Sequence, residues 1–430
     1  DRLPTRIDGM ENADIERLTS RARRIEATPQ GLRAVLDEVL PPRVRIDAAR
    51  AAQHVVLHER VAADRRMAFL VNMSETDSVA TTLHLRGATI VEDWDAATGA
   101  TRPAPARSDA HGAVLPLELA PGQSRLLVFA ENTPATPAAR TCAPEQRVTL
   151  DGPWHVRRLT PNALTLDICR VRRGDGDWSQ PMPVIGAQQM LCEDEPYTGP
   201  VTLAFDFRVT DVPARLAVAV EDAGECAVAI NGAAVSSTGE AYFLDRSFLP
   251  VELTPHVTAG DNTITVTRMF TPLAKPAFGL AHLFQNLGGT ELEAVYLVGD
   301  FAVRAAMSPR EQRKRCVRLA PRFTLVRETG RTRGDLVLDG YPFFAGRLVL
   351  STSFTFAPQA GARCTLALPG LDASVARLRV NGRDAGHIAW PPYEADITDA
   401  VRAGNNMIEI EIASSLRNLL GPHHRPAGEP

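Results

Sequence analysis

The sequence predicts a mainly β protein, in which an antiparallel β-sandwich is followed by two further β-sandwiches and preceded by a short helical segment. Three observations predict this fold class. Short segments of alternating apolar and polar residues recur from about Gln53 onward, with turn residues between them. One pattern of strands and turns occurs twice in the second half of the chain. Only residues 10–40 carry apolar residues at good helical spacing.

The composition narrows the class of protein and its partners. The chain has 430 residues, of which 44% are hydrophobic and 23% charged, as in ordinary globular proteins. No apolar run approaches the ~18 residues of a membrane helix, so we predict no membrane insertion. The net charge of -4 gives no general attraction to nucleic acid, and we predict no nucleic-acid partner. The six cysteines stand singly, which argues against a disulfide scaffold and for free thiols.

The N-terminal segment is expected to form two short amphipathic helices. Apolar residues recur at helical spacing from Ile15 to Ile25, and again from Leu32 to Leu40. Pro29-Gln30-Gly31 interrupts the pattern between them. Two such helices have too little apolar surface to stand alone. We therefore expect residues 1–46 to be the helical remnant of an upstream domain.

Residues 47–131 are expected to form a small antiparallel β-sandwich. Their apolar residues recur with a period of two, and turn residues such as Pro121-Gly122 separate the segments. Residues 132–146 follow as a linker rich in Pro, Thr and Ala. The expected strands are His54–Glu59, Met67–Asn72, Thr81–Leu85, Thr89–Trp94, Val114–Leu119 and Arg125–Phe129.

The remaining strands contain an internal repeat. Asn231-Gly232 and Asn381-Gly382 each end an apolar strand, as suits a type I′ hairpin turn. The pattern that follows each of them is Val251-Glu252-Leu253-Thr254 with Ala259-Gly260-Asp261-Asn262, and Ala395-Asp396-Ile397-Thr398 with Ala403-Gly404-Asn405-Asn406. This order is typical of jelly-roll, galactose-binding-like domains, and turn chemistry explains these residues. We predict jelly rolls at 147–315, with an insertion at 268–300, and at 316–420, followed by a tail at 421–430.

Familiar catalytic motifs are absent from the sequence. GxSxG, GxxxxGK[ST], GxGxxG and HExxH do not occur, which argues against serine hydrolases, P-loop and Rossmann proteins and zincins. His54 and His58 share a strand face but lack a third ligand, and no metal site is predicted. No cofactor is predicted, and a structural calcium in a jelly-roll loop stays open. Nothing singles out a catalytic pair among the carboxylates of Glu193-Asp194-Glu195, Glu221-Asp222, Glu240 and Asp245.

Five residues are candidates for ligand binding. Trp390 and Tyr393 lie in a proline-rich loop, where aromatic rings can stack on a sugar; Tyr341 lies in the similar segment 341–346. The alternative is that these rings cover the end of a sandwich core, where we also expect Trp154. Asn418 and His423 belong to an apolar C-terminal segment, for which docking against another domain is the alternative to ligand binding.

Several strings together resemble one enzyme family. The chain resembles the C-terminal β-domain region of bacterial glycoside hydrolases related to the family 106 α-L-rhamnosidases, which carry jelly rolls similar to the sugar-binding domain of family 2 enzymes. His58-Glu59-Arg60, Phe69–Asn72 and Asp93–Gly99 resemble the small β domain before those jelly rolls. The jelly-roll strings are Asp151-Gly152-Pro153-Trp154, Asn162–Asp167, Tyr296–Phe301, Gly340–Gly346 and Ser415–His423.

The resemblance implies a carbohydrate ligand and an upstream catalytic domain as partners. In such enzymes the catalytic carboxylates belong to an N-terminal (β/α)₈ barrel, and no alternating βα pattern occurs here. No catalytic residue is therefore carried over. The preferred hypothesis is a non-catalytic accessory or sugar-binding region of such a hydrolase. The alternatives are a stand-alone carbohydrate-binding protein and, third, a self-contained glycosidase that uses jelly-roll carboxylates. The sequence does not decide between a cytoplasmic and an exported location.

Overall fold

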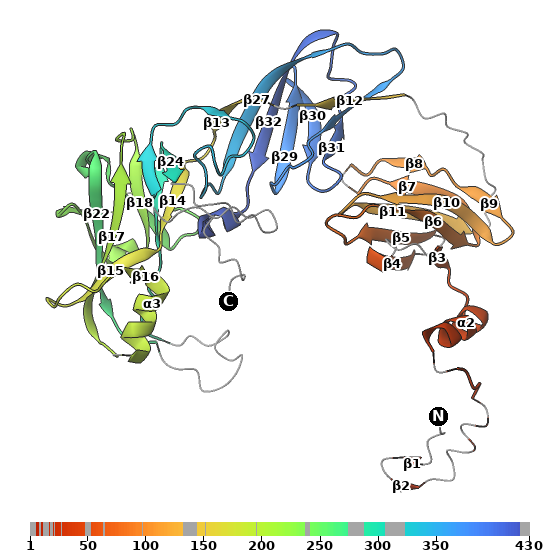
Figure 1. Ribbon diagram of the computed structural model, residues 1–430, viewed down its shortest axis with the longest axis horizontal. Helices are drawn as coiled ribbons and strands as arrows, with labels where there is room; N and C mark the ends of the chain where they lie inside the picture. Colours follow the sequence, from red (N-terminus) through yellow and green to blue (C-terminus); the bar gives the residue numbers. More distant parts are fainter. Residues whose placement is uncertain are drawn as a thin grey trace. The chain divides into compact units, whose positions relative to one another are not determined.

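The computed structural model is mainly β, as the sequence predicts, and its strands form antiparallel sandwiches (Figure 1). It divides into two compact units, one of residues 1–142 with Trp390–Pro392 and one of residues 143–389 with 393–430. No helix among the described residues is long and apolar enough to cross a membrane. The residues that the structure describes are 6–7, 10–11, 17, 20, 22–26, 28–47, 53–62, 65–96, 98–131, 144–150, 152–194, 196–236, 241–273, 288–305 and 323–421.

The N-terminal segment contains a strand pair and one helix among its described residues. Strands β1 (Arg6–Ile7) and β2 (Met10–Glu11) pair with each other, and helix α2 spans Pro29–Val39. Pro29-Gln30-Gly31 forms the first turn of this helix and does not interrupt it, which corrects the sequence analysis. Proline is favourable there because its missing N–H would have no partner, and the Thr28 side chain accepts from the Gly31 N–H. The expected helix from Ile15 lies mostly outside the described residues.

The N-terminal sandwich comprises β3–β11 and confirms the strands expected between 54 and 129. Its two sheets enclose a core in which Leu83, Leu115 and Leu127 are fully buried. The apolar side chains of β10 alternate with exposed ones, as a half-buried strand requires. One sheet has β3 (Val44–Ile46), β6 (Val79–Arg86), β10 (Gly112–Leu119) and β9 (Arg107–Asp109); the other has β4 (Val55–Ala62), β5 (Arg65–Asn72), β11 (Ser124–Glu131), β7 (Ala88–Trp94) and β8 (Thr101–Pro103).

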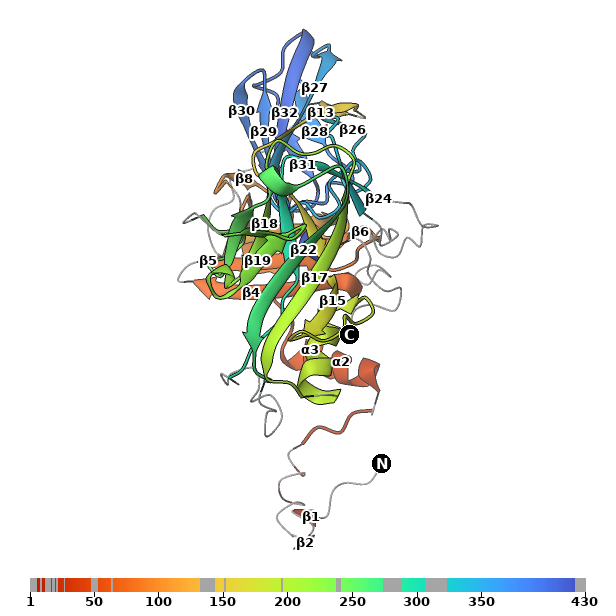
Figure 2. The ribbon, with the colours of Figure 1, turned by 90° about the vertical axis from the view of Figure 1, so that its left-hand side faces the viewer.

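We call β14–β25 the first sandwich. Its long strands β17 and β22 pair antiparallel along their whole length, as Figure 2 shows. One sheet contains β14 (Asn162–Leu166), β23 (Val295–Gly299), β18 (Leu216–Glu221) and β21 (Phe248–Glu252). The other contains β16 (Met182–Pro183), β15 (Ile168–Arg173), β17 (Gly199–Val209), β22 (Gly260–Phe270), β19 (Ala227–Ile230) and β20 (Ala233–Val235), joined at β17 by β25 (Phe323–Val326) and β24 (Ala302–Ala305). Short helical segments connect the strands: α3 (Val184–Gln189), η2 (Met190–Asp194), η3 (Ala223–Glu225) and η4 (Thr254–His256).

The second sandwich is built from strands that precede the first sandwich in the sequence and from strands that follow it. Strand β12 pairs with β28, and β13 pairs with β27, whereas the sequence analysis assigned both N-terminal strands to the first jelly roll. Strand pairing is a non-local property, which local periodicity does not encode. One sheet has β12 (Glu145–Thr149), β28 (Arg363–Ala367) and β31 (Glu394–Asp396); the other has β26 (Arg331–Thr332), β13 (Trp154–Arg158), β27 (Arg347–Phe356), β32 (Gly404–Ala413), β29 (Val375–Val380) and β30 (Arg383–Ile388).

The same network of asparagine hydrogen bonds occurs in the first and in the second sandwich. In the first, the Asn231 amide donates to the Asn262 side chain at 2.8 Å, and the buried Asn262 amide donates to two carbonyls of its own turn. In the second, Asn381 donates to Asn406 at 2.8 Å, and Asn406 donates to its turn in the same way. Both hairpins have positive φ at Asn and Gly, as a type I′ turn requires. The repeat seen in the sequence is therefore a repeat of structure.

Buried polar groups join the two sandwiches at a junction. The Asn162 side chain, fully buried, donates to the carbonyls of Phe301 and Gly340 at 2.9 and 3.0 Å. The Thr165 hydroxyl donates to the Leu419 carbonyl at 2.6 Å, and the Leu419 side chain packs into a small apolar cluster. Segment η6 (Leu416–Leu420) thus docks on the first sandwich, as the alternative interpretation of the C-terminal segment expects.

Candidate functional site

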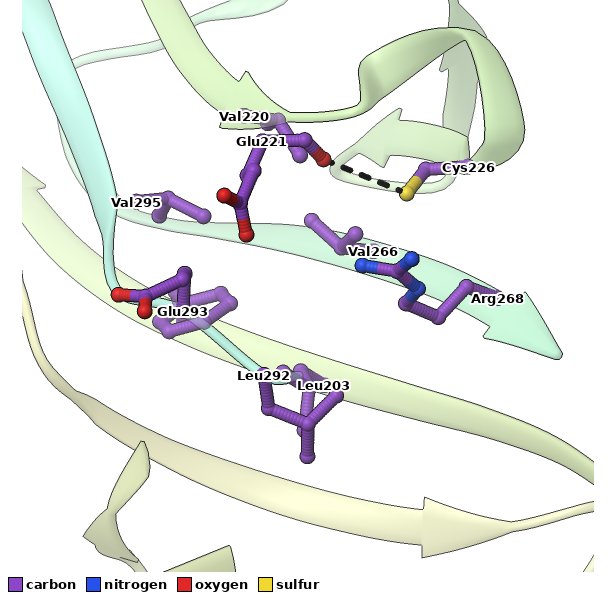
Figure 3. A pocket seen from close by; sticks show the side chains of 10 residues that line it. Leu203, Val220, Glu221, Cys226, Val266, Arg268, Leu292, Glu293 and Val295 are labelled. Carbon is purple, nitrogen blue, oxygen red and sulfur yellow. Dashed lines mark hydrogen bonds between the residues drawn. The ribbon is translucent and has the colours of Figure 1, made fainter. Parts of the chain in front are cut away.

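A pocket opens at one end of the first sandwich, between its two sheets (Figure 3). Its screened space holds about one water molecule, and the rest of the hollow is open to solvent. Its walls are mostly apolar and buried, whereas two carboxylates, one guanidinium and one thiol also line it. The lining residues are Leu203, Phe205, Val220, Glu221, Cys226, Val266, Arg268, Leu292, Glu293 and Val295.

Four separate segments bring the polar side chains of the pocket together. Glu221 is the last residue of β18, and Asp222 then adopts a left-handed conformation that turns the chain through η3 to Cys226. Arg268 projects from β22 on the facing sheet. Glu293 lies just before β23, in a segment that α3 positions. There the buried Gln188 side chain accepts from the Leu292 N–H at 2.7 Å and donates to the Thr290 carbonyl at 3.2 Å.

The two carboxyl groups of the pocket have the same electrostatic tendency. Burial raises the pKa of Glu221 above its ordinary value, and the negative charge of Glu293 raises it further. Burial also raises the pKa of Glu293, with Glu291 as the next cause, although Glu293 lies at the exposed rim. Both groups are therefore poorly solvated acceptors, and hydrogen-bond donors from a ligand would relieve that condition.

Arg268 supplies the positive charge of the pocket. Its side chain is 16% exposed and lies 3.8 Å from the exposed Glu225 carboxylate. One terminal nitrogen donates to the Glu291 carbonyl at 3.3 Å. Its Nε is buried and has no hydrogen-bond partner in the described part of the chain. Nearby, burial raises the pKa of the Cys226 thiol, which keeps this side chain in its unreactive thiol form. The pocket is thus equipped for binding through hydrogen bonds.

The aromatic candidates from the sequence lie in different surroundings. Trp390 is 47% exposed, and Tyr393 is half-buried against the core of the second sandwich. Tyr341 is only 3% exposed and packs edge-on against Phe344 in that core, where Trp154 also lies as expected. Tyr341 and Tyr393 thus share the core of the second sandwich, and neither lines the pocket of the first. For Trp390 and Tyr393, ligand binding stays a prediction.

The C-terminal candidates lie at the junction or beyond the described residues. The Asn418 amide donates to the Phe344 carbonyl at 3.0 Å, so this side chain helps to hold η6 in place. His423 lies outside the described residues. The apolar interior position of Tyr341 and the backbone contact of Asn418 give both residues a structural task. Among the described residues, no group of three or more His, Cys, Asp or Glu is placed to hold a metal ion.

Sequence reasoning found one member of the pocket and missed the others. The sequence analysis names Glu221 among the carboxylates, but it names neither Glu293 nor Arg268. A signal for Glu293 exists in the segment 290–295, where polar and apolar residues alternate into a strand. An arginine near the end of a strand is usually solvent-exposed, so the sequence gives no reason to place Arg268 in a pocket. Only the structure shows that these side chains converge.

Comparisons with known proteins show similarity to solved glycoside hydrolases. No family model and no curated protein matches the chain. A rhamnosidase from Novosphingobium sp. PP1Y is 17% identical with a TM-score of 0.39, over 94% of this chain and 24% of that one. An α-L-rhamnosidase from Streptomyces avermitilis is 13% identical with a TM-score of 0.24, over 89% and 38%.

A third similar structure is a β-D-glucuronidase from Dictyoglomus thermophilum. It is 13% identical with a TM-score of 0.23, over 58% of this chain and 39% of that one. This chain therefore spans about a quarter to two fifths of the length of these three proteins. At these identities and TM-scores, the similarity assigns neither a substrate nor an activity to this chain.

Proposed function

We propose that this chain is a non-catalytic, carbohydrate-binding β region of a bacterial glycoside hydrolase resembling the α-L-rhamnosidases. The resemblance of its sequence strings to that family supports the proposal. Hydrolysis of the glycosidic bond would belong to an upstream catalytic domain.

The pKa shifts of the two carboxyl groups in the pocket support the non-catalytic part of the proposal. Glycosidases need one carboxyl group that is protonated and one that is ionised, so their surroundings must drive the two pKa values apart. In this pocket the pKa values of Glu221 and Glu293 are both raised, and burial is the first cause for each. The two shifts have the same sign, so no shift of opposite sign marks one group as the acid and the other as the nucleophile. The self-contained glycosidase is therefore the least favoured alternative.

A catalytic partner domain is supported by the exposed apolar face of α2. Leu32 and Leu36 are about half exposed, and Val39 and Leu40 are 70% and 76% exposed. Apolar side chains gathered on one helix favour burial against another protein surface. A stand-alone carbohydrate-binding protein gives no reason for this face. We therefore favour the accessory region over the stand-alone protein.

Two measurements test the proposed function. Immunoblotting of source cells with antibody against residues 147–420 should give a band far above 46.6 kDa, because the catalytic domain would share the polypeptide. A native band at 46.6 kDa would favour the stand-alone binding protein instead. The purified chain should hydrolyse no p-nitrophenyl glycoside, α-L-rhamnoside included. Turnover that disappears in Glu221→Gln would establish the glycosidase.

A further inference from the structure

The five-stranded sheet of the N-terminal sandwich is apolar on both of its faces. Its inner face carries Ala68, Leu70 and Leu127, which belong to the core of that sandwich. The residues between them point to the other side of the sheet, because side chains alternate along a strand. The apolar residues of this outer face all lie outside the core cluster: Val56 on β4, Met67, Phe69 and Val71 on β5, Leu126 and Val128 on β11, and Ile90 and Trp94 on β7.

Much of this outer face is open to solvent. Val56 is 56% exposed and Phe69 is 36% exposed, and Leu126 and Trp94 are half-buried. The solvent side of an antiparallel sheet is ordinarily polar. The other sheet of the same sandwich follows that rule, since its outer face carries Arg45 on β3, Ala80, Thr82, His84 and Arg86 on β6, and Val114, Pro116 and Glu118 on β10. An apolar outer face therefore indicates an interaction surface.

The first sandwich shows how an apolar outer face is covered in this protein. In the sheet that contains β14, β21 and β23, the residues Ala163, Phe248 and Val298 form a cluster apart from the main core of that sandwich. The Leu419 side chain of η6 packs onto this cluster, and its members are buried. In the described part of the N-terminal sandwich, by contrast, Val56 and Phe69 stay exposed. A further surface is therefore expected to cover them.

Opposite charges stand at the two sides of the apolar outer face. Arg60 of β4 pairs with Met67 of β5. Across β11, Val128 connects Met67 to Glu92 of β7, so Arg60 and Glu92 belong to one row of the sheet. Arg60 is exposed and forms no ion pair with any described residue. Glu92 has a long contact of 3.9 Å with the exposed Arg65. The row is thus positive at one side and negative at the other.

We propose that this outer face binds the same face of a second copy of the chain. A two-fold axis parallel to the strands, between β5 and β11, places β4 of one copy over β7 of the other and β5 over β11. Each Arg60 then meets the Glu92 of the second copy, so two ion pairs flank an apolar centre. In that centre, Phe69 packs on Leu126 of the second copy. Such an axis keeps the strands nearly aligned, as in ordinary packing of two sheets, and gives an isologous dimer.

The charge pattern and the size of the face favour a second copy as the occupant. After the two-fold rotation the face complements itself, whereas a partner surface of uniform charge is repelled at one of its two sides. Four strands of seven or eight residues, about 4.8 Å apart and with ~3.3 Å per residue, present roughly 500 Å². A standard interface buries ~800 Å² per partner. We therefore expect a weak dimer, with a dissociation constant on the order of 10 µM.

Sedimentation equilibrium of the 430-residue chain tests the proposed dimer. The chain is measured from about tenfold below to about tenfold above that dissociation constant, and its mass should rise from 46.6 kDa toward twice that value. Phe69→Glu should weaken dimerisation about tenfold or more, because it places a charge in the apolar centre. Val114→Glu makes a comparable change on the outer face of the other sheet, and this control should dimerise like the parent chain.

Arg60→Glu and Glu92→Arg test the position of the two-fold axis. Each variant alone brings like charges together twice in the dimer, and it should dimerise about tenfold more weakly than the parent chain. An equimolar mixture of the two variants should recover dimers, because every facing pair then combines opposite charges. Arg86→Glu, on the other sheet, is the charge control. Glu92→Arg also removes the acceptor of the Trp94 Nε1, so thermal unfolding verifies that each variant is folded.

Three outcomes overturn the proposed dimer. A mass of 46.6 kDa at every concentration would assign the outer face to another occupant, such as the catalytic domain of the proposed function. A dimer that Phe69→Glu leaves as strong as that of the parent chain would lie on a different surface. A mixture of the two charge variants that is no more dimeric than either variant alone would reject the two-fold arrangement. Dimerisation is independent of the proposed function, since its test uses neither a sugar nor a catalytic domain.

Discussion

The charged side chains at the two ends of the first sandwich differ in how completely they are paired. At the junction with the second sandwich, Arg158 pairs with Asp300 at 3.0 Å and with Glu328, and its side chain is only 10% exposed. Hydrogen bonds from Arg215 and Arg158 hold the pKa of Asp300 below its ordinary value. At the pocket, the pKa values of Glu221 and Glu293 are raised instead. The junction is electrostatically satisfied, and the pocket is not.

This difference separates stability from binding within one domain. A satisfied network stabilises the fold and gives a ligand nothing to improve. An unsatisfied set costs stability in the free protein and gains hydrogen bonds when a ligand arrives. Four predictions follow the comparison from the junction to the pocket, and their expected effects on the free energy of unfolding decrease and finally change sign.

Asn162→Ala should have the largest effect. It removes the Asn162 donor from the Phe301 carbonyl, one of two donors from the Gly340 carbonyl, and the acceptor of the Ala163 N–H, in a fully buried place. We expect a loss of about 2–4 kcal/mol in the free energy of unfolding, since each unsatisfied buried group costs roughly 1–3 kcal/mol. Urea unfolding followed by tryptophan fluorescence measures it. Asn405→Ala, at an exposed position of β32, should change little, and an equal loss in both variants would contradict the prediction.

Leu419→Ala tests the apolar part of the junction. Leu419 is 4% exposed among Ala163, Ala219, Phe248 and Val298. Truncation of a buried leucine typically costs about 2–5 kcal/mol, and we expect the lower half of that range because the surrounding cluster is small. The same urea titration measures it. Leu416→Ala and Leu420→Ala are matched controls in the same segment, since both leucines are more than half exposed, and neither should lose more than about 0.5 kcal/mol.

The candidate site and the fold differ in how much of them the sequence predicts. Strand periodicity and Asn-Gly turns are local, so the sandwiches, the hairpins and the repeat follow from the residues themselves. The pairing of β12 and β13 with distant strands does not, because a strand does not encode its partner over some 200 residues of chain. The pocket joins polar side chains from four segments, and single-sequence reasoning has no measure of such convergence.

The strings that carried the family resemblance lie largely at the junction. Asn162 donates there to the carbonyls of Phe301 and Gly340. Thr165 donates to the Leu419 carbonyl, and Asn418 donates to the Phe344 carbonyl. Distinctive sequence in this chain therefore marks where two sandwiches are joined. This explains why Tyr341 and Asn418, which belong to those strings, have structural surroundings. The pocket residues Glu221, Arg268 and Glu293 lie outside the strings.

Asp300→Asn should have a moderate effect that depends on pH. The folded-state pKa of Asp300 is lowered, so its ion pairs stabilise the protein above the unfolded value of 3.8, and that stability is lost as the pH falls through the folded value. At pH 7 we expect a loss of about 1 kcal/mol, because Arg158 keeps Glu328 and solvent screens the exposed Arg215. Urea unfolding at pH 7 and pH 3 measures both points. Asp261→Asn, which breaks a highly exposed pair, should show no such dependence.

Glu221→Gln should have the smallest effect and the opposite sign. The folded-state pKa of Glu221 is raised above the unfolded value of 4.5, so the folded protein binds more protons and loses stability as the pH rises through the interval between the two values. The amide removes that loss. We expect the variant to be more stable than the parent chain at pH 7, by less than about 1 kcal/mol after discount for partial exposure, and the gain to vanish below pH 4.5. Paired urea titrations at pH 7 and pH 4 measure it, with Glu118→Gln as the exposed control. A loss of stability at pH 7 would mean that Glu221 is a satisfied structural carboxylate like Asp300, and the contrast between pocket and junction would then disappear.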